Sequence, residues 1–328
     1  MGWKDLFKSK VIRVKPDPRL RWFGKLPTYA DYYSSPTDEE WAVEFNDWVL
    51  KGFETYLGRL GGTQHVPRLP SAACALRLPK SGMTVFASFQ DYGGDMRGRP
   101  FPLCFYVGVP SEQWPGPTSD RVGPALRLLR ELTDLRDEVF RFCNSPGRFD
   151  ATFGGRELDV TELAAAAVDD SWTRGGAGLQ LAEWFAAVRP CVKIDELDRW
   201  AVVVDAWGES IARLESPEFE PTLRFPLVMS LPFDAQVGGW LHWLGRRMDL
   251  GERLLSLVVG RGGDDGTGRL TVIARDVVPE DFLLLTTAAG SLPYLDDLCA
   301  LTGERVAADG PRDAPQRWAD FVSSAARP

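Results

Sequence analysis

The chain has 328 residues, with 38 lysines and arginines against 46 aspartates and glutamates, so its formal net charge is -8. Hydrophobic residues make up 44% and charged residues 26%, which is close to average globular usage and excludes collagen, a coiled coil and wholesale disorder. The acidic balance argues against sequence-independent binding of nucleic acid, because that needs a broad basic face. No apolar run reaches the ~20 residues that cross a bilayer.

Residues 1–20 are predicted to form a basic amphipathic arm, in which apolar residues alternate with lysines and arginines and Asp5 is the only acid before Pro16. Such an arm predicts either transient contact of residues 1–15 with the inner membrane or a solvated segment packed on the body. Charged residues interrupt any signal-peptide core. The five cysteines are widely spaced and include no CxxC pair, so we expect a reducing, cytoplasmic location.

The first domain is predicted to span residues 21–150. We expect a helix over 37–57, because Thr37 and Glu40 have the spacing of a capping box and large apolar residues then recur at helical intervals. A second helix is expected over 122–143. Between the two helices, apolar runs predict strands at 72–78, 84–90 and 101–109.

A run rich in glycine, proline and asparagine at 144–155 predicts the boundary to a second domain over 151–303, with a tail at 304–328. Helices are expected at 160–168, 179–188, 234–248, 279–289 and 294–301. Strands are expected at 200–205, 223–231, 254–259 and 269–274, the last two as a hairpin. The fold class predicted is α+β, with helices on mainly antiparallel sheet and a second α/β lobe.

Signals for catalysis are weak. HExxH, GxSxG and GxxxxGK[ST] are absent, so the sequence predicts no zinc face, nucleophile elbow or phosphate loop. The glycine-rich loop 260–268 contains Asp264 and Asp265, whose oxygens suit a divalent metal, although Asp-Gly is also a hairpin turn. An alternative function is therefore a metal-dependent hydrolase or phosphatase that uses this loop. A peripheral membrane adaptor held by residues 1–15 is another. Our main expectation is no enzyme, no cofactor and no metal.

Three short motifs stand in order between residues 23 and 103. The first contains Gly24, Lys25, Leu26, Pro27 and Asp31; the second, Asp47, Trp48 and Leu50; the third, Asp95, Gly98, Arg99, Phe101, Pro102 and Leu103. Together they resemble the TagF/ImpM family, accessory proteins of bacterial type VI secretion. This chain departs from the family pattern at Ala30, Tyr32 and Asn46.

The motif residues also have a physical interpretation. Gly24 and Pro27 bracket a position where the backbone is special or fixed, and Trp48 is a large apolar anchor. Pro100 and Pro102 suit the start or edge of a strand. A pair between Arg99 and either Asp95 or Asp31 would fix the loop 91–99, since an arginine fork matches a carboxylate.

The resemblance implies a longin-like α/β sandwich for residues 20–150 and a cytoplasmic, non-enzymatic regulator that restrains assembly or firing of the secretion apparatus. It also implies type VI components as partners, foremost a forkhead-associated (FHA) scaffold protein. Because loops on a rigid scaffold usually carry recognition, we expect the partner-binding surface at the loop 91–99 and near Lys25. Its candidate residues are Lys25, Asp31, Asp91, Asp95, Arg97 and Arg99.

Overall fold

The computed structural model describes residues 17–61, 66–114, 116–119, 121–142, 146–164, 176, 178–192, 194–213, 221–247, 255–261, 267–286, 292–300 and 318–323. Its strands are β1 (Asp17–Gly24), β2 (Tyr33–Ser34), β3 (Ala72–Arg77), β4 (Met83–Gln90), β5 (Leu103–Pro110), β6 (Thr222–Val228), β7 (Ser256–Arg261), β8 (Thr267–Ile273) and β9 (Leu295–Asp297). The longer helices are α1 (Glu40–Arg59), α2 (Val122–Phe142), α7 (Leu197–Arg213) and α8 (Phe233–Arg247). Shorter ones are α3 (Pro146–Phe153), α4 (Thr161–Ala164), α6 (Leu181–Val188) and α9 (Trp318–Ser323), with 3-10 turns η2 (Arg189–Cys191), η3 (Pro279–Leu285) and η5 (Leu298–Ala300).

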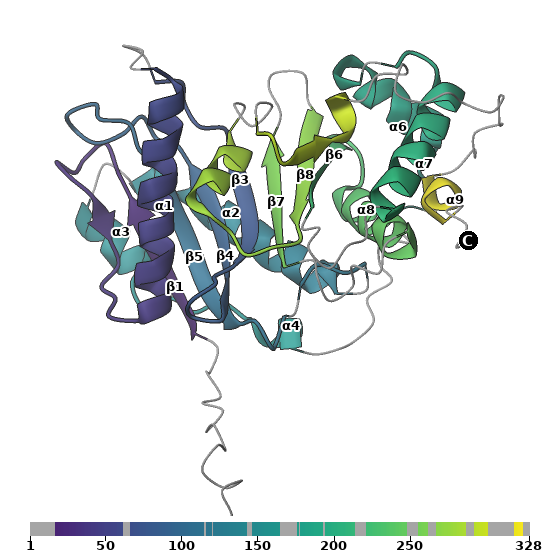
Figure 1. Cartoon of the computed structure of the whole chain (residues 1–328). Coiled ribbons are helices and arrows are strands. Elements are labelled where there is room, and N and C mark those ends of the chain that lie inside the picture. Colours follow the sequence, from purple (N-terminus) through teal and green to yellow (C-terminus); the bar gives the residue numbers. More distant parts are fainter. Residues whose placement is uncertain are drawn as a thin grey trace, which may run out of the picture.

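One sheet connects all the described strands, in the order β2-β1-β5-β4-β3-β7-β8-β6-β9 (Figure 1). Neighbouring strands are antiparallel except β6 and β9, which are parallel. Helices cover both faces, so the α+β class with a mainly antiparallel sheet is confirmed. The two halves of the chain meet where β3 pairs with β7, with Cys74 opposite Val258. The sheet therefore continues across the predicted boundary at 144–155.

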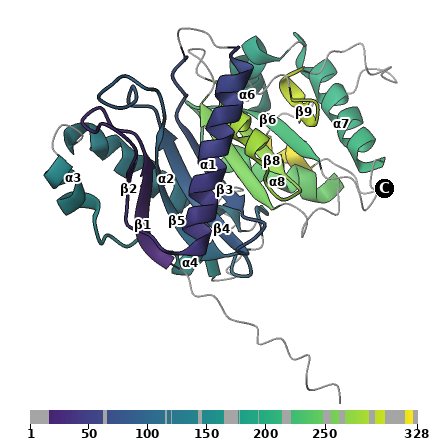
Figure 2. The ribbon, with the colours of Figure 1, turned by 60° about the vertical axis from the view of Figure 1, so that its left-hand side comes forward.

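Helix α1 and the turn η3 cover one face of the sheet, as Figures 1 and 2 show. The helix forms because large apolar residues recur at helical spacing and all turn to that face; they include Trp41, Phe45, Trp48, Val49, Phe53 and Tyr56. Alternate strand residues such as Cys74, Leu76 and Tyr106 meet them from the sheet. The edge of an α1 tryptophan ring packs against Gly108 of β5 and leaves no room there for a side chain.

The opposite face is covered by α2, α3, α6 and α8, which share one apolar core with the other alternate strand residues. At its far end Trp184, Trp200 and Trp240 lie with ring centroids 5.2 to 6.3 Å apart. Phe321 of α9 packs on Trp200 at 5.3 Å, so α9 belongs to this core.

Several predicted elements need correction. Residues 200–205 belong to helix α7 and not to a strand. The three consecutive valines at 202–204 suggested a strand. The buried residues of this segment nevertheless recur at helical spacing: Trp200, Val203, Val204 and Trp207. Within the helix predicted at 294–301, the structure instead has β9 at Leu295–Asp297 followed by the 3-10 turn η5 at Leu298–Ala300. The capping box at residue 37 is also wrong, because α1 begins at Glu40 without a side-chain cap. Strand β1 was not predicted.

Candidate functional site

The loop between β4 and β5, residues 91–99, is organised around the carboxylate of Asp95. This side chain is fully buried and accepts the backbone N–H groups of Arg97 (2.9 Å) and Arg99 (3.0 Å) and the Nε–H of Arg99 (2.7 Å). Burial alone would raise the pKa of Asp95, but the hydrogen bonds from Arg99 and Arg97 outweigh it and lower the pKa to about 2. Asp95 is therefore a charged structural centre of the loop.

Lys25 provides a second cation for that carboxylate. Its Nζ lies 3.6 Å from Asp95 Oδ2 and 4.8 Å from the centre of the Tyr32 ring, and only 6% of its side chain is exposed. The expectation that Lys25 presents its charge on the surface is thus wrong. It lies directly after β1 and joins the first motif to the third.

Asp91 is also buried, contrary to its predicted place on the surface. Its carboxylate accepts the backbone N–H groups of Gly93 (2.7 Å) and Leu69 (3.2 Å), which ties the start of the loop to the segment before β3. Within the described part of the chain, Asp91 therefore stabilises the loop and does not present its charge to a partner.

Arg99 forms both of the ion pairs predicted as alternatives. Its Nε bonds Asp95, and its Nη2 lies 3.6 Å from Asp31 Oδ1 and donates to the carbonyl of Ala30 at 2.6 Å. The backbone N–H of Met96 donates to the carbonyl of Tyr29 at 2.9 Å. The loop and the segment 25–33 are therefore held together by charged and backbone bonds.

Glycines let this part of the backbone close tightly. Gly94 has φ +85°, and a Cβ there would overlap the carbonyl of Arg99. A Cβ at Gly24, with φ +148°, would overlap the carbonyl of Pro102. Both positions therefore need glycine for space as well as for conformation.

The other motif residues brace the fold. Phe101 is buried and packs against Phe53 and Tyr32, with ring centroids 4.8 and 4.9 Å apart. Trp48 donates its Nε1–H to the carbonyl of Val278 at 2.9 Å. Asp47 forms an exposed pair with Lys51 one helical turn away. Pro27 is exposed, and Gly98 has φ +72° in the loop.

What remains on the outside of this assembly is a small set of residues that we call the loop platform: Asp31, Tyr32, Met96, Arg97 and Arg99. Met96 is 62% exposed and Tyr32 45%, so two large side chains with much apolar surface are accessible on the loop platform. The Arg97 side chain is exposed and has no partner among the described residues. The sequence prediction missed Tyr32 and Met96, and no sequence signal marks Met96.

Other candidates lie elsewhere. Residues 1–15, His65, Asp264 and Asp265 are outside the described residues. Across the described ranges, no three or more His, Cys, Asp or Glu side chains form a group that could hold a metal ion. Burial, with the nearby Arg246, lowers the pKa of His242 in α8. None of the described helices combines the length and apolar character required to span a bilayer.

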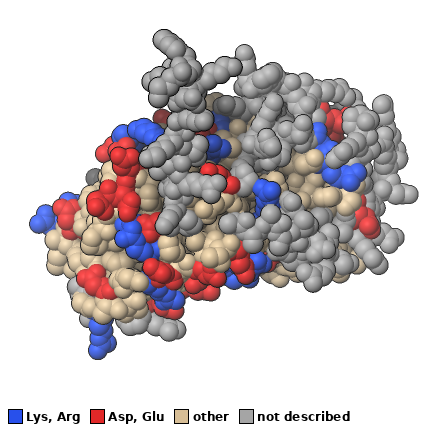
Figure 3. All heavy atoms as spheres, turned by 90° about the horizontal axis from the view of Figure 1, so that it is seen from below, with Lys and Arg blue, Asp and Glu red and all other residues tan. Residues whose placement is uncertain are grey.

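On the face seen in Figure 3, basic and acidic side chains lie next to one another among uncharged residues. Ion pairs also lie at the surface of the described residues, such as Arg127 with Glu162 at 2.8 Å. Surface pairs of this kind contribute little to stability. Arg97 differs from them, since no acidic side chain in the described part of the chain pairs with it.

Neither a protein-family model nor a curated protein matches this sequence. Among solved structures, the comparison finds the crystal structure of PA0076 from Pseudomonas aeruginosa PAO1, 16% identical, with a TM-score of 0.36. The match covers 84% of this chain and 97% of that chain. A likeness this distant does not indicate a function for this chain.

Proposed function

We propose that this chain is a non-enzymatic accessory protein of a bacterial type VI secretion system. It acts in the cytoplasm by protein–protein interaction and restrains assembly or firing of the apparatus. The three motifs that resemble the TagF/ImpM family support this proposal. The first and third bond to each other through Lys25, Asp95, Arg99 and Asp31, although they are about 70 residues apart in the sequence.

The observation that carries the proposal is the loop platform. An exposed methionine, an exposed tyrosine and an arginine with no partner among the described residues belong to this surface, and a buried carboxylate holds its loop in place. Tyr32 is itself fixed, because its ring stacks on Phe23 at 5.6 Å and meets Phe101 edge-on. Aromatic residues and arginines are the commonest energetic centres of protein interfaces. A preorganised loop also loses less entropy on binding.

The partner proposed is a type VI component with an acidic, partly apolar surface, foremost an FHA-domain scaffold protein. The test is co-purification of that scaffold after co-expression with full-length chains carrying Arg97→Glu or Met96→Asp. We expect each variant to weaken binding by about 30-fold or more, the effect of losing a strong interface residue. Neither side chain bonds the rest of the described structure, so melting temperature should not change.

Arg121→Glu is the matched control, since Arg121 is an exposed arginine away from the platform. It makes the same change in net charge as Arg97→Glu, so a general electrostatic effect would weaken binding equally in these two variants. Full binding by both platform variants would rule the platform out as the interface.

A further inference from the structure

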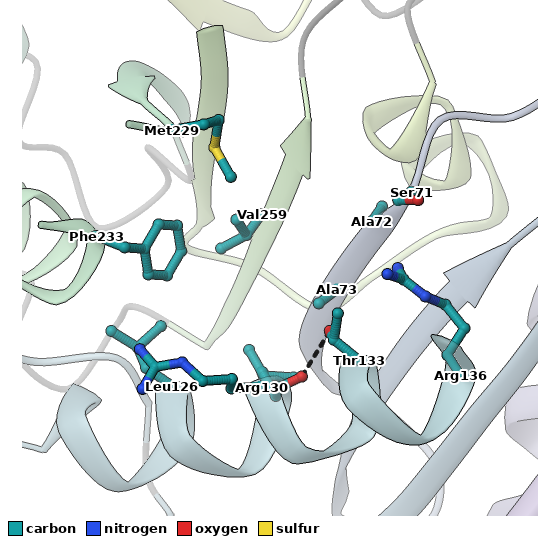
Figure 4. Close-up of a pocket in the computed structure, with 11 residues that line it drawn as sticks. Ser71, Ala72, Ala73, Leu126, Arg130, Thr133, Arg136, Met229, Phe233 and Val259 are labelled. Atoms are coloured by element: carbon teal, nitrogen blue, oxygen red, sulfur yellow. Dashed lines mark hydrogen bonds between the residues drawn. The ribbon is translucent and has the colours of Figure 1, made fainter. Parts of the chain in front are cut away.

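A pocket of about 200 Å³ lies where the two halves of the chain meet, between the sheet and α2 (Figure 4). Its floor is formed by Ala73 of β3 and Val259 of β7, which are paired across the seam. Leu126 and Thr133 of α2 form one wall, and the other is formed by Met229, directly after β6, and Phe233, the first residue of α8. Pockets of this kind occur preferentially where two parts of a protein join.

The hollow exists because β3 is built from small residues. Its first four residues are Ala-Ala-Cys-Ala, so the sheet offers little volume below α2 at this point. The mouth is apolar and partly exposed: Met229 is 36% exposed and Phe233 is half-buried. Methionine adapts its shape to what it contacts and is common at binding surfaces.

Two arginines of α2 stand at opposite sides of the pocket (Figure 4). Arg130 Nη2 donates to Asp234 at 3.0 Å, whereas its Nε and Nη1 have no partner among the described residues. Arg136 is buried, donates to Asp137 and reaches the carbonyl of Phe89 at 3.4 Å. The two arginines and their partners Asp234 and Asp137 together carry no net charge, so the pocket has no excess positive charge that would attract an anion. Arg130 can still donate hydrogen bonds to an oxygen at the mouth.

The volume decides between kinds of occupant. Pockets for drug-sized ligands and cofactors measure roughly 300–1,000 Å³, whereas a cavity of about 150 Å³ is filled by benzene. The space here suits one phenyl-sized or branched aliphatic group. A single apolar anchor in a pocket with a polar rim is how protein interfaces concentrate their affinity.

We propose that this pocket receives one aromatic or branched aliphatic side chain from a segment of a protein partner, with an adjacent backbone carbonyl or carboxylate bound by Arg130. This is a second interaction site, separate from the loop platform, and it goes beyond the proposed function. The proposal about the pocket can therefore be right or wrong whatever the outcome for the proposed function.

The test selects a phage-displayed library of random dodecapeptides on the immobilised full-length chain and measures the affinity of the enriched peptides. We expect them to share one Phe, Trp, Leu or Ile. Ala73→Leu, which fills the pocket from its floor, should weaken binding by about 30-fold or more. Arg130→Gln should weaken it by a smaller factor. Arg121→Gln is the control for loss of an exposed arginine, and Arg97→Glu should leave peptide binding unchanged.

Met229→Trp provides a second way to block the pocket, because it closes the exposed mouth without adding atoms to the core. It should weaken binding even if Ala73→Leu lowers the melting temperature. Peptides that bind both blocked variants as tightly as the parent would overturn the proposal, as would a selection that enriches no peptide. Displacement of the peptides by phenylacetate at lower concentrations than any peptide requires would assign the pocket to a small molecule instead.

Discussion

Replacing Asp95 by asparagine tests whether the buried carboxylate holds the loop platform in place. Asparagine has nearly the same shape and its oxygen can still accept the two backbone N–H groups. Its amide nitrogen, however, faces the Nε of Arg99 and the Nζ of Lys25, which are both donors. The variant therefore loses a charge-assisted hydrogen bond and leaves the Lys25 cation buried without a counter-ion.

The expected cost is about 3 kcal/mol. A hydrogen bond to a charged group contributes about 1.5–3 kcal/mol, and removal of one partner from a buried ion pair costs roughly 3–5 kcal/mol, with the two effects overlapping here. With an unfolding entropy of about 2.1 cal/mol/K per residue, the melting temperature should fall by about 4 °C. Urea and thermal unfolding at neutral pH measure both quantities.

Asp31→Asn is the matched control, because Asp31 lies near the same Arg99 but 71% of its side chain is exposed. We expect a loss within about 0.5 kcal/mol, as for other exposed pairs. Equal and small losses in the two variants would refute the argument that burial makes Asp95 the centre of the loop.

The same variant predicts a pH dependence. Because the pKa of Asp95 is lowered from 3.8 to about 2 in the folded chain, its stabilisation is complete above about pH 4 and disappears as the pH falls through about 2. The difference in unfolding free energy between parent and Asp95→Asn should therefore stay constant from pH 7 to 5 and shrink below pH 4. A difference that persists unchanged to pH 2 would contradict this.

Two further pairs of variants test the packing of the loop and of α1 by urea unfolding. Gly94→Ala should cost more than 3 kcal/mol, because its Cβ overlaps backbone, whereas Gly98→Ala, with open space at its Cβ, should cost about 1 kcal/mol for the positive φ alone. In α1, Gly58→Ala should stabilise the chain by roughly 0.5–1 kcal/mol, while Gly52→Ala should destabilise it because its Cβ overlaps the side chain of Phe282. Similar effects within either pair would contradict the packing described.

The parts of the fold that the sequence predicted are those with strong local patterns. Strands β3 to β5, the β7–β8 hairpin and helices α1, α2 and α8 all follow from apolar runs or helical spacing. Strand β1 has no such pattern, since arginines at 19 and 21 alternate with its apolar residues. Arg21 is nevertheless 4% exposed, because Asp17 pairs with it at 2.7 Å. A strand that buries its charges cannot be recognised from hydrophobicity alone.

In the candidate site, too, contacts between residues close in sequence could be predicted, whereas long-range contacts could not. The Asp95–Arg99 pair is four residues apart, and its loop geometry could be proposed from the sequence. Burial of Lys25 against Asp95 depends on the pairing of β1 with β5, a long-range contact that no local pattern contains. Asp91 is similar, because its partner Leu69 lies before β3. Three of the six candidate residues were therefore assigned to the surface although the fold buries them.

The burial of these charges itself argues for a role in positioning. Apolar residues of similar volume commonly replace a buried ion pair without loss of stability, so stability alone does not explain why Lys25 and Asp95 are buried together. What an apolar substitute could not supply is the set of bonds from Asp95 to the backbone at 97 and 99. Those bonds fix the direction in which Met96 and Arg97 leave the loop. A platform ordered before its partner arrives loses less entropy on binding, so the affinity of a few exposed side chains can suffice.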